Sequence, residues 1–427
     1  MSRARKILLL GADGFIGRHI AFHLRAEGWQ VVASARRVRA LDQMGFQTAA
    51  ADLARPETHD PAFWAPHLKG CQYVVNAAGL LTGSEDAFQG VHVLAPKAIY
   101  QAMPDGCRAL LISAVGLEAE TDFARYRRQG EALADRHRVT ILRPGLVLAD
   151  SAYGGSALAR GLAALPLVTP VVGKGEQVFN PIHATDLAKV ILACLADRPG
   201  PGAHEIGGPD RVTQGEMLQS IRRWLGLRPV PLLHMPRWLA GGLARVGDVL
   251  KFGPISSTAL DQLATGVEAQ EAPLLEHLPE TARPRGFSQF MAARPAGTAD
   301  LWHARLYLMK PALRLVLILL WLVSGLLGLF LPSQSFLPMI PEGMLSDPVL
   351  IMLARAGGVA DLALAVGLAA AWRLRLLGWL QLGLVGAYTL AFTVLSPDLW
   401  LLPLGGLLKN LPILMLIWLF LVLEEER

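Results

Sequence analysis

The sequence predicts an α/β doubly wound domain followed by an all-α bundle of four transmembrane helices. Three observations predict this fold: a strand, glycine turn, helix and strand at the start, an uneven distribution of charge, and four long apolar stretches near the end. The chain has 427 residues, of which 52% are hydrophobic and 18% charged. Residues 311–427 hold only 13 of the 75 charged side chains, a contrast typical of a soluble domain joined to a membrane domain.

The charged residues, cysteines and histidines exclude several classes of site. The net charge of +5 is spread along the chain, which argues against a nucleic-acid surface. Cys71, Cys107 and Cys194 are far apart and the histidines show no paired spacing, so we expect no disulfide and no metal site. The apolar run at residues 7–10 is too short for a signal peptide, which predicts that the first domain stays on the cytoplasmic side.

The first 35 residues have the pattern of a nucleotide-binding unit. An apolar strand at residues 6–10 runs into Gly11-x-x-Gly14-x-x-Gly17, then a helix, then a second strand at residues 30–35. The glycines allow a tight turn, a close approach of the backbone to a pyrophosphate, and close packing of helix on strand. Since the start of the helix attracts anions, we expect a dinucleotide there. The alternative is a βαβ turn without a ligand.

The end of the second strand bears on the choice of cofactor. A site for NAD usually has an acidic residue at this point to bind the ribose 2′-hydroxyl, but Arg36 and Arg37 follow the strand here. Two guanidinium groups suit a 2′-phosphate, so NADP(H) is favoured over NAD(H). The alternative is that both arginines are ordinary solvated surface charges.

Further strands continue the alternation with helices. Apolar strands are expected at residues 73–77, 109–113 and 139–142, which predicts a parallel, doubly wound sheet.

Over residues 5–230 the sequence resembles the atypical and extended short-chain dehydrogenase/reductases, whose first domain is a Rossmann fold. The glycine spacing, Ala51-Asp52-Leu53, Asn76-Ala77-Ala78-Gly79, Leu142-Arg143-Pro144-Gly145 and the segment from Asn180 to Ala188 carry the resemblance. It implies an adenine contact at Asp-Leu and a nicotinamide contact near the proline. The expected cofactor-binding residues are Gly11, Gly14, Phe15, Ile16, Gly17, Arg36, Arg37, Asp52, Leu53, Ala77, Ala78, Gly79 and Pro144.

The catalytic positions depart from the pattern of this family, in which a Ser, a Tyr and a Lys four residues after the Tyr act together. Ser113 stands at the position of the family's Ser. If Tyr126 is the Tyr, Gly130 takes the place of the Lys; in the better-matching register, Phe123 replaces the Tyr and Arg127 the Lys. Phe has no proton to give and Arg stays charged, so ordinary carbonyl reduction is in doubt. Ser113, Tyr126 and Arg127 are the catalytic candidates, with Tyr126 relying on a neighbouring Arg for its cation.

The remaining part of the first domain is expected to form the substrate side. We place the short-chain dehydrogenase/reductase-like domain at residues 1–278, its substrate half at 151–278, and a proline- and arginine-rich linker at 279–309. Residues 236–250 form an amphipathic helix that could pack in the ordinary way or rest on a bilayer surface.

The last 118 residues, 310–427, predict four membrane helices. Apolar stretches at residues 312–331, 349–371, 376–395 and 404–423 each approach the ~20 residues that a bilayer core requires. Basic residues lie before the first stretch and between the second and third, whereas Glu342, Asp347 and Asp398 lie in the other loops. The positive-inside rule therefore predicts four spans with both termini in the cytoplasm. We expect an integral protein of a bacterial-type cytoplasmic membrane, as the resemblance of this part to a bacterial membrane family, described next, implies.

Four polar side chains within these stretches are candidates for an intramembrane site: Arg355, Asp361, Tyr388 and Lys409. Ionisable groups are costly in lipid, so we expect Asp361 to pair with Arg355 or Lys409, with Tyr388 close. The alternative is that these groups only join the helices to one another. The segments around Arg355–Asp361 and Lys409 resemble the DoxX-like family of four-helix membrane proteins, which implies the fold and a possible link to quinone redox chemistry.

Two functions remain open. One is a membrane-tethered NADP(H)-dependent oxidoreductase with an unknown substrate, linked to a quinone or another membrane redox partner. The other is a catalytically silent NADPH-binding module that stabilises or regulates a membrane complex, as implied by a resemblance to an accessory subunit of respiratory NADH:quinone reductase.

Overall fold

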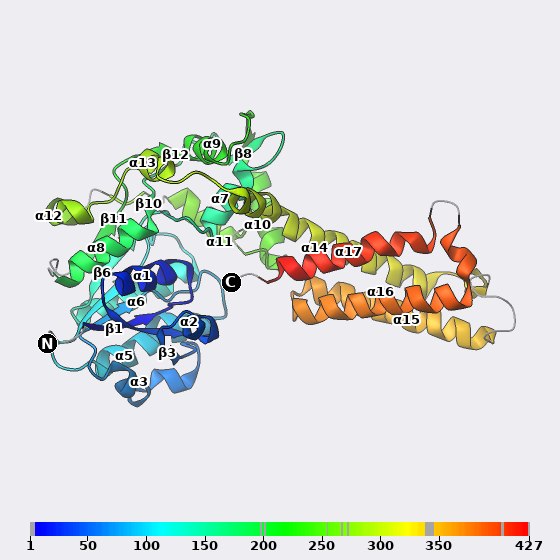
Figure 1. Cartoon of the computed structure of the whole chain (residues 1–427), viewed down its shortest axis with the longest axis horizontal. Helices are drawn as coiled ribbons and strands as arrows, with labels where there is room; N and C mark the ends of the chain where they lie inside the picture. The colour runs from blue at the N-terminus through cyan, green and yellow to red at the C-terminus, as the bar shows by residue number, and fades with distance from the viewer. Residues whose placement is uncertain are drawn as a thin grey trace. The chain divides into compact units, whose positions relative to one another are not determined.

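The computed structural model divides the chain into two compact units (Figure 1). The first comprises residues 1–244 and 254–301, and the second comprises residues 245–253 and 302–427. The structure describes residues 5–196, 199, 202–253, 255–265, 268–270, 273–337, 346–402 and 405–425.

The first unit is built on a seven-stranded sheet in the order β11-β6-β5-β4-β1-β2-β3, all neighbours being parallel. The strands are β1 (Lys6–Leu10), β2 (Gln30–Ala35), β3 (Gln47–Ala50), β4 (Tyr73–Asn76), β5 (Arg108–Ile112), β6 (Thr140–Pro144) and β11 (Ala203–Ile206). From β1 the strands are added toward one edge of the sheet as far as β3, and from β4 they are added toward the other edge. A doubly wound fold binds ligands beyond the carboxyl ends of the strands at such a switch point, here between β1 and β4.

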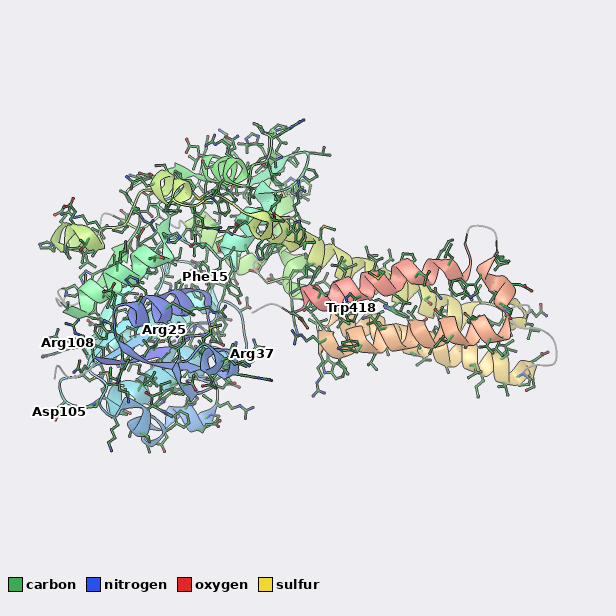
Figure 2. The ribbon with its side chains drawn as sticks, in the orientation of Figure 1. Phe15, Arg25, Arg37, Asp105, Arg108 and Trp418 are labelled. Atoms are coloured by element: carbon green, nitrogen blue, oxygen red, sulfur yellow. The ribbon has the colours of Figure 1, made fainter. Side chains whose placement is uncertain are left out.

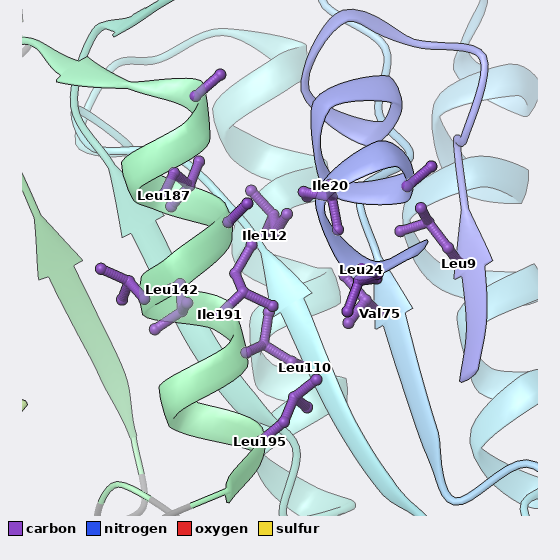
Figure 3. Packing of buried hydrophobic residues seen from close by; sticks show 14 of the residues in the cluster. Leu9, Ile20, Leu24, Val75, Leu110, Ile112, Leu142, Leu187, Ile191 and Leu195 are labelled. Atoms are coloured by element: carbon purple, nitrogen blue, oxygen red, sulfur yellow. The ribbon is translucent and has the colours of Figure 1, made fainter. Parts of the chain in front are cut away.

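Helices cover both faces of the sheet. On one face lie α1 (Phe15–Ala26) and α8 (Ala184–Ala196), which pack against each other and against the sheet (Figure 3). On the other lie α3 (Pro61–Leu68), α5 (Ala95–Ala102) and α6 (Asp122–Arg136). In β1, Ile7 and Leu9 enter the first core and Leu8 and Leu10 the second, which explains the unbroken apolar run.

Short elements complete the first unit. They are the helices α2 (Arg39–Gln43), α4 (Glu85–Gln89), α7 (Gly155–Ala163), α9 (Gln214–Trp224), α10 (Arg237–Leu250), α11 (Ser257–Thr265), α12 (Pro273–His277) and α13 (Phe287–Ala292), and the strand pairs β7 (Val147–Leu148) with β10 (Ile182–His183), β8 (Thr169–Val172) with β13 (Leu232–Met235), and β9 (Val178–Phe179) with β12 (Val212–Thr213). The end of α10 belongs to the second unit.

The segment expected as a linker differs from that expectation over residues 279–301, which fold as part of the first unit. Phe287 and Phe290 of α13 are buried and pack edge to face. The Arg285 guanidinium donates from Nε to the fully buried Asp186 carboxylate over 2.8 Å, at the start of α8. Proline and arginine content predicted a solvated spacer, but a buried ion pair and two aromatic rings hold these residues on the domain.

The second unit contains α14 (Thr298–Phe330), which begins in the first unit, α15 (Asp347–Ala369), α16 (Leu374–Leu395) and α17 (Asn410–Leu423). Among the described residues α14, α15 and α16 are long and apolar enough to cross a membrane, while Leu407–Leu423 forms a shorter apolar helical stretch. The expected first residue of the fourth stretch, at position 404, lies outside the described residues, as does Glu342.

Small residues bring α14 and α15 together. A Cβ on Gly328 would lie 2.8 Å from the Cα of Gly358, and one on Gly325 would lie 2.8 Å from the carbonyl oxygen of Gly358. Such close contact of backbones is typical of helix pairs in membranes, where dispersion and hydrogen bonds stabilise the contact.

Candidate functional site

The glycine turn after β1 has the geometry expected of a nucleotide site. Gly11 has φ +71°, in the left-handed region, and a Cβ there would lie 2.9 Å from the Cα of Ala78. A Cβ on Gly17 would overlap with the carbonyl oxygen of Gly11. The first and third glycines therefore hold the turn, the helix and the β4 loop in close contact.

The first turn of α1 is open to an anion. Gly14 is the residue before the helix, and no side chain caps the backbone N–H groups that follow it. The first turn holds no acidic residue either. Uncapped N–H groups and the helix dipole together fit the pyrophosphate of a dinucleotide, and Phe15 and Ile16 lie in this turn (Figure 2).

The residues expected around the adenosine half follow β2 and β3. Arg36 and Arg37 are exposed, and the Arg37 side chain projects into solvent (Figure 2). Ala51 N–H donates to the carbonyl oxygen of Ala35 over 2.9 Å, which joins the ends of the two strands. The Asp52 carboxylate accepts from Ala54 N–H over 3.2 Å, and Leu53 is buried. The arginines after β2 and the Asp-Leu pair after β3 therefore lie at the same edge of the sheet.

The loop after β4 and the end of β5 meet at Arg127. Its Nη1 donates to the carbonyl oxygen of Ile112 over 2.9 Å, and a Cβ on Gly79 would overlap with its Nη2. Ala77 and Ala78 are half-buried beside this contact. Ser113 follows β5 and its buried Oγ has no hydrogen-bond partner among the described residues; the same holds for Nε of Arg127. Buried polar groups normally have a hydrogen-bond partner, so these two atoms are candidates to bind a ligand.

Tyr126 is hydrogen-bonded to the start of α4. Its hydroxyl donates to Glu85 Oε1 over 2.8 Å, and its ring stacks on Phe88 at 5.7 Å between centroids. The hydrogen bond to the carboxylate raises the pKa of the Tyr126 phenol. Phe123, three residues earlier in α6, is buried, and the Arg127 guanidinium lies over its ring at 5.7 Å. Phe123 and Tyr126 pack in the same apolar cluster, and within α6 it is Arg127 that reaches Gly79 in the loop after β4.

Burial also lowers the pKa of two basic side chains beside the loop after β4. Burial lowers the pKa of Arg127 to about 10 and that of His92 to about 3, the latter with help from the Arg127 charge. His92 is therefore neutral at physiological pH. Leu80 N–H donates to its Nε2 over 3.3 Å. Sequence reasoning missed His92, because its position in the short π-helical segment Gly90–Leu94 gives no motif.

A hollow lies beyond β6 in the first unit, and sequence reasoning missed most of it. Its lining includes Asp150, Arg160, His183, Trp224 and Arg294. The Arg160 and Arg294 guanidinium groups lie over the Trp224 ring at 4.8 and 5.2 Å. No spacing in the sequence marks this set, since its members come from segments up to 144 residues apart.

Ion pairs made by two arginine side chains connect the residues around this hollow. Arg294 bonds Asp150 over 3.0 Å and Asp300 over 2.9 Å, and Arg160 approaches Asp300 at 3.3 Å. His183 Nδ1 accepts from Thr185 N–H over 3.3 Å, which holds its ring at the start of α8. Burial lowers the pKa of His183, and Asp150 partly offsets this.

Pro144, the expected nicotinamide contact, is buried at the end of β6.

Among the residues that the structure describes, Asp361 forms no ion pair with Arg355 or Lys409, contrary to expectation. Asp361 accepts from Ser324 Oγ over 2.6 Å, and its other buried oxygen has no partner among the described residues. Arg355 instead donates to the carbonyl oxygens of Gly328, over 3.0 Å, and Leu331, over 2.7 Å. Carbonyls freed at the end of α14 are strong acceptors in a low dielectric, and they hold this guanidinium away from the carboxylate.

The two other intramembrane candidates, Tyr388 and Lys409, belong to the same unit. A Cβ on Gly357 would lie 2.7 Å from the Tyr388 hydroxyl, which places the phenol against α15. Lys409 ends the short helical segment before α17. Next to it Asn410, which was not among the candidates, donates to Thr389 over 2.9 Å.

Two family models match the sequence. Residues 7–99 match the NAD dependent epimerase/dehydratase family, and residues 318–418 match the DoxX-like family. The chain therefore joins an epimerase-type, NAD-binding Rossmann domain to a DoxX-like domain, and its apolar helices indicate an integral membrane protein. The dinucleotide turn and the parallel sheet agree with an NAD(P)-binding fold.

Curated relatives match the first part of the chain. The chain is 25% identical over 240 residues to the mitochondrial NADH dehydrogenase [ubiquinone] 1 alpha subcomplex subunit 9 of Arabidopsis thaliana, covering 51% of this chain and 58% of that protein. It is 25% identical over 241 residues to the ceramide reductase of Caulobacter vibrioides, covering 54% and 73%. The chain thus spans little more than half the length of the first of these relatives.

Solved structures with a similar first domain include a dTDP-glucose 4,6-dehydratase from Bacillus anthracis in complex with NAD. It is 14% identical, with a TM-score of 0.46 that covers 55% of this chain and 85% of that one. A UDP-glucuronic acid 4-epimerase from Bacillus cereus, also in complex with NAD, is 17% identical with a TM-score of 0.45, covering 54% and 88%.

Proposed function

We propose that this chain is a membrane-anchored NAD(P)(H)-binding protein that holds its nucleotide without catalysing ordinary carbonyl reduction. The observation that carries the proposal is a pair of contacts made by α6. Arg127, with Phe123 beneath it, reaches the loop after β4 and the end of β5, while the Tyr126 hydroxyl is hydrogen-bonded to Glu85. An intact glycine turn beside an incomplete proton-transfer pair favours binding over turnover.

The physical reason concerns the proton. A bound nicotinamide supplies a hydride, but reduction of a carbonyl also needs a proton for the oxygen. Phe123 has no exchangeable proton, and a guanidinium stays charged even where burial lowers the pKa to about 10. Ser113 can hold a ligand oxygen in place without replacing the missing acid.

In this function the nucleotide acts as a structural ligand. A ligand that binds only the folded domain stabilises it by mass action, by ~2.7 kcal/mol at a concentration one hundred times its Kd. The nucleotide would then regulate or stabilise the membrane bundle, or a complex that contains it. The similarity to a subunit of an NADH dehydrogenase supports this role, although the match covers 58% of that protein.

The preference for NADP(H) over NAD(H) is part of the proposal. Arg36 and Arg37 directly follow β2 and are exposed, so both guanidinium groups are accessible to a 2′-phosphate. The solved structures with a similar fold hold NAD, which makes this preference the first to test. In the double variant Arg36→Ala/Arg37→Ala the Kd for NADPH should rise while that for NADH stays within a factor of about two.

One experiment tests the main proposal. The full chain is purified in detergent, its bound nucleotide is identified, and NADPH absorbance is followed with carbonyl compounds and with quinones. We expect tight binding without oxidation of NADPH. Steady oxidation with any carbonyl compound would contradict the proposal, and a Tyr126→Phe variant would then show whether that phenol takes part.

A second function, electron transfer from the nucleotide to a lipid-soluble quinone, is favoured by one observation. Asp361 in α15 is buried and one of its carboxylate oxygens has no hydrogen-bond partner in the described part of the chain, and Tyr388 lies against the same helix. An intramembrane carboxylate with an open hydrogen-bonding position suits proton delivery to a quinone. Oxidation of NADPH with quinones but not carbonyl compounds, abolished in Asp361→Asn and retained in Ser333→Ala, would establish this function instead.

The orientation is also proposed. We propose four spans with both termini in the cytoplasm, since basic residues precede α14 and lie between α15 and α16, whereas Asp347 and Asp398 lie at the opposite ends. The stretch Leu407–Leu423 would provide the fourth span.

A further inference from the structure

Helix α10 (Arg237–Leu250) has three distinct faces, which follow from its sequence at 100° per residue. Ala240, Ala244 and Gly247 share one narrow face and are buried, so the helix packs through its small residues. The charged residues Arg237, Arg245 and Asp248 share a second face. The third, about 140° wide on this wheel, is wholly apolar apart from one glycine.

The apolar face of α10 is exposed. It consists of Trp238, Leu239, Leu243, Val246 and Val249, all of them more than a third exposed. Trp238 is 77% exposed and Val249 is 75% exposed. Five large apolar side chains in one stripe are more than the scattered exposed residues normal for a soluble surface, so this stripe indicates a partner.

The end of α10 is fixed to the membrane unit. Residues 245–253 belong to that unit, and Lys251 Nζ donates to the carbonyl oxygen of Ala370 over 3.3 Å. The Arg314 guanidinium lies over the Phe252 ring at 5.4 Å, and its Nε donates to the carbonyl oxygen of Leu368 over 2.8 Å. The last turn of α10 therefore sits at the terminus of α15, where a membrane helix leaves the hydrocarbon.

The residues at that terminus are those of a membrane–water boundary. Trp372 is 53% exposed, and Arg373 and Arg375 follow it. Aromatic and basic side chains gather where a helix meets the lipid headgroups. Val246 and Val249 of the stripe belong to the same unit as this terminus, which favours lipid as the partner of the stripe.

We propose that α10 is an interfacial helix that lies on the bilayer, with its apolar stripe in the acyl region and its charged face toward the headgroups. The partner is the lipid of the membrane that holds α14–α17, and not a second protein. Arg237, Arg245 and Lys251 against one Asp248 give the helix a basic character, which favours anionic headgroups. This inference is independent of whether the nucleotide site is catalytic.

Spin labels test the proposal in the full chain. The three native cysteines are replaced by serine, and a nitroxide is attached at Val246→Cys, at the centre of the stripe, or at Arg237→Cys, on the opposite side of the helix. Each protein is placed in nanodiscs of phosphatidylcholine, with or without phosphatidylglycerol. Collision rates are then measured with oxygen, which enters lipid, and with a water-soluble nickel chelate.

The label at residue 246 should collide at least several-fold more with oxygen than with the nickel chelate, and the label at residue 237 should show the reverse. Water-like collisions at both positions would overturn the proposal. So would a label at residue 246 that neither reagent reaches, because that result would mean a protein covers the stripe. A label at Leu167→Cys, 78% exposed in the loop after α7, calibrates the fully hydrated limit.

Discussion

At the scale of single residues, the chemistry of the first unit is decided by what burial does to Ser113, Arg127 and His92. Each lies against the loop after β4 or the end of β5, and burial lowers the pKa of both Arg127 and His92. His92 is neutral because charging it would cost its desolvation next to another cation. In the proposed function these groups hold the nucleotide and none of them supplies the proton that carbonyl reduction needs.

The low pKa of His92 predicts how stability depends on pH. Its pKa falls from 6.5 in the unfolded chain to about 3 in the folded one, so between these values the unfolded chain binds the extra proton. Stability is therefore lost as the pH falls below about 6.5, by ~2 kcal/mol at pH 5 from this group alone. Hydrogen exchange of β4 and α5 at pH 7 and pH 5 measures it, in wild type and in His92→Gln.

The variant His92→Gln serves as the control, because glutamine does not titrate. It should show a smaller loss of protection between pH 7 and pH 5 than the wild type. Equal losses in the two proteins would mean that other groups set the acid sensitivity of this region.

A substitution in the glycine turn tests the nucleotide site in either function. In Gly14→Asp the new carboxylate would stand at the start of α1, where it repels a pyrophosphate and caps the N–H groups that should bind it. We expect at least a ~100-fold rise in the Kd for NADPH, measured by calorimetry. Gly155→Asp, at an open position at the start of α7, should bind as the wild type does. Normal binding by Gly14→Asp would remove the site from this turn.

At the scale of elements, the buried ion pair between Asp186 and Arg285 explains why residues 279–301 fold back on the first unit. Asp186 starts α8, is fully buried, and receives Nε of Arg285 over 2.8 Å and Nζ of Lys189 over 3.2 Å. These cations lower the pKa of the carboxyl group against the opposing effect of its burial. One carboxylate thus joins a helix start to a segment 99 residues away.

Removing that carboxylate should release the segment. Asp186→Asn leaves Arg285 without its charged partner and should destabilise the first unit by ~3 kcal/mol or more. Limited proteolysis should then cut within residues 279–297 well before the wild type is cut. Asp261→Asn, in the exposed part of α11, is the matched control and should be cut at the wild-type rate. Unchanged resistance in Asp186→Asn would mean that the buried rings of α13 suffice.

At the scale of the whole molecule, the number of spans decides on which side of the membrane each end lies. The helices α14, α15 and α16 are each long enough to cross, and the helical stretch Leu407–Leu423 rises only ~25 Å against a core of ~30 Å. Four crossings put both ends on one side, and three put them on opposite sides.

Reporter fusions at the two termini distinguish these arrangements. A reporter that fluoresces only in the cytoplasm should be active at either end, and a phosphatase that works only outside should be inactive at both. Opposite signals at the two ends would show three spans, with residues 407–423 lying in the interface.

The sequence by itself determined the doubly wound domain, its glycine turn and the apolar helices, because these depend on local periodicity and on turn residues. It also identified the two possible registers of the catalytic helix. Only the tertiary structure showed that Arg127 bonds the end of β5 while the Tyr126 hydroxyl bonds Glu85, since that depends on how the helix packs on the sheet.

The same distinction explains the residues that sequence reasoning did not find. Asp361 was expected to pair with Arg355 or Lys409, but Arg355 donates to carbonyl oxygens at the C-terminal end of α14 and the Asp361 carboxylate accepts from Ser324. Arg160, Arg294 and Trp224 form one cluster from distant segments. Contacts of this kind are set by the three-dimensional path of the chain, whereas a pattern in the sequence reports only on neighbours within a few turns.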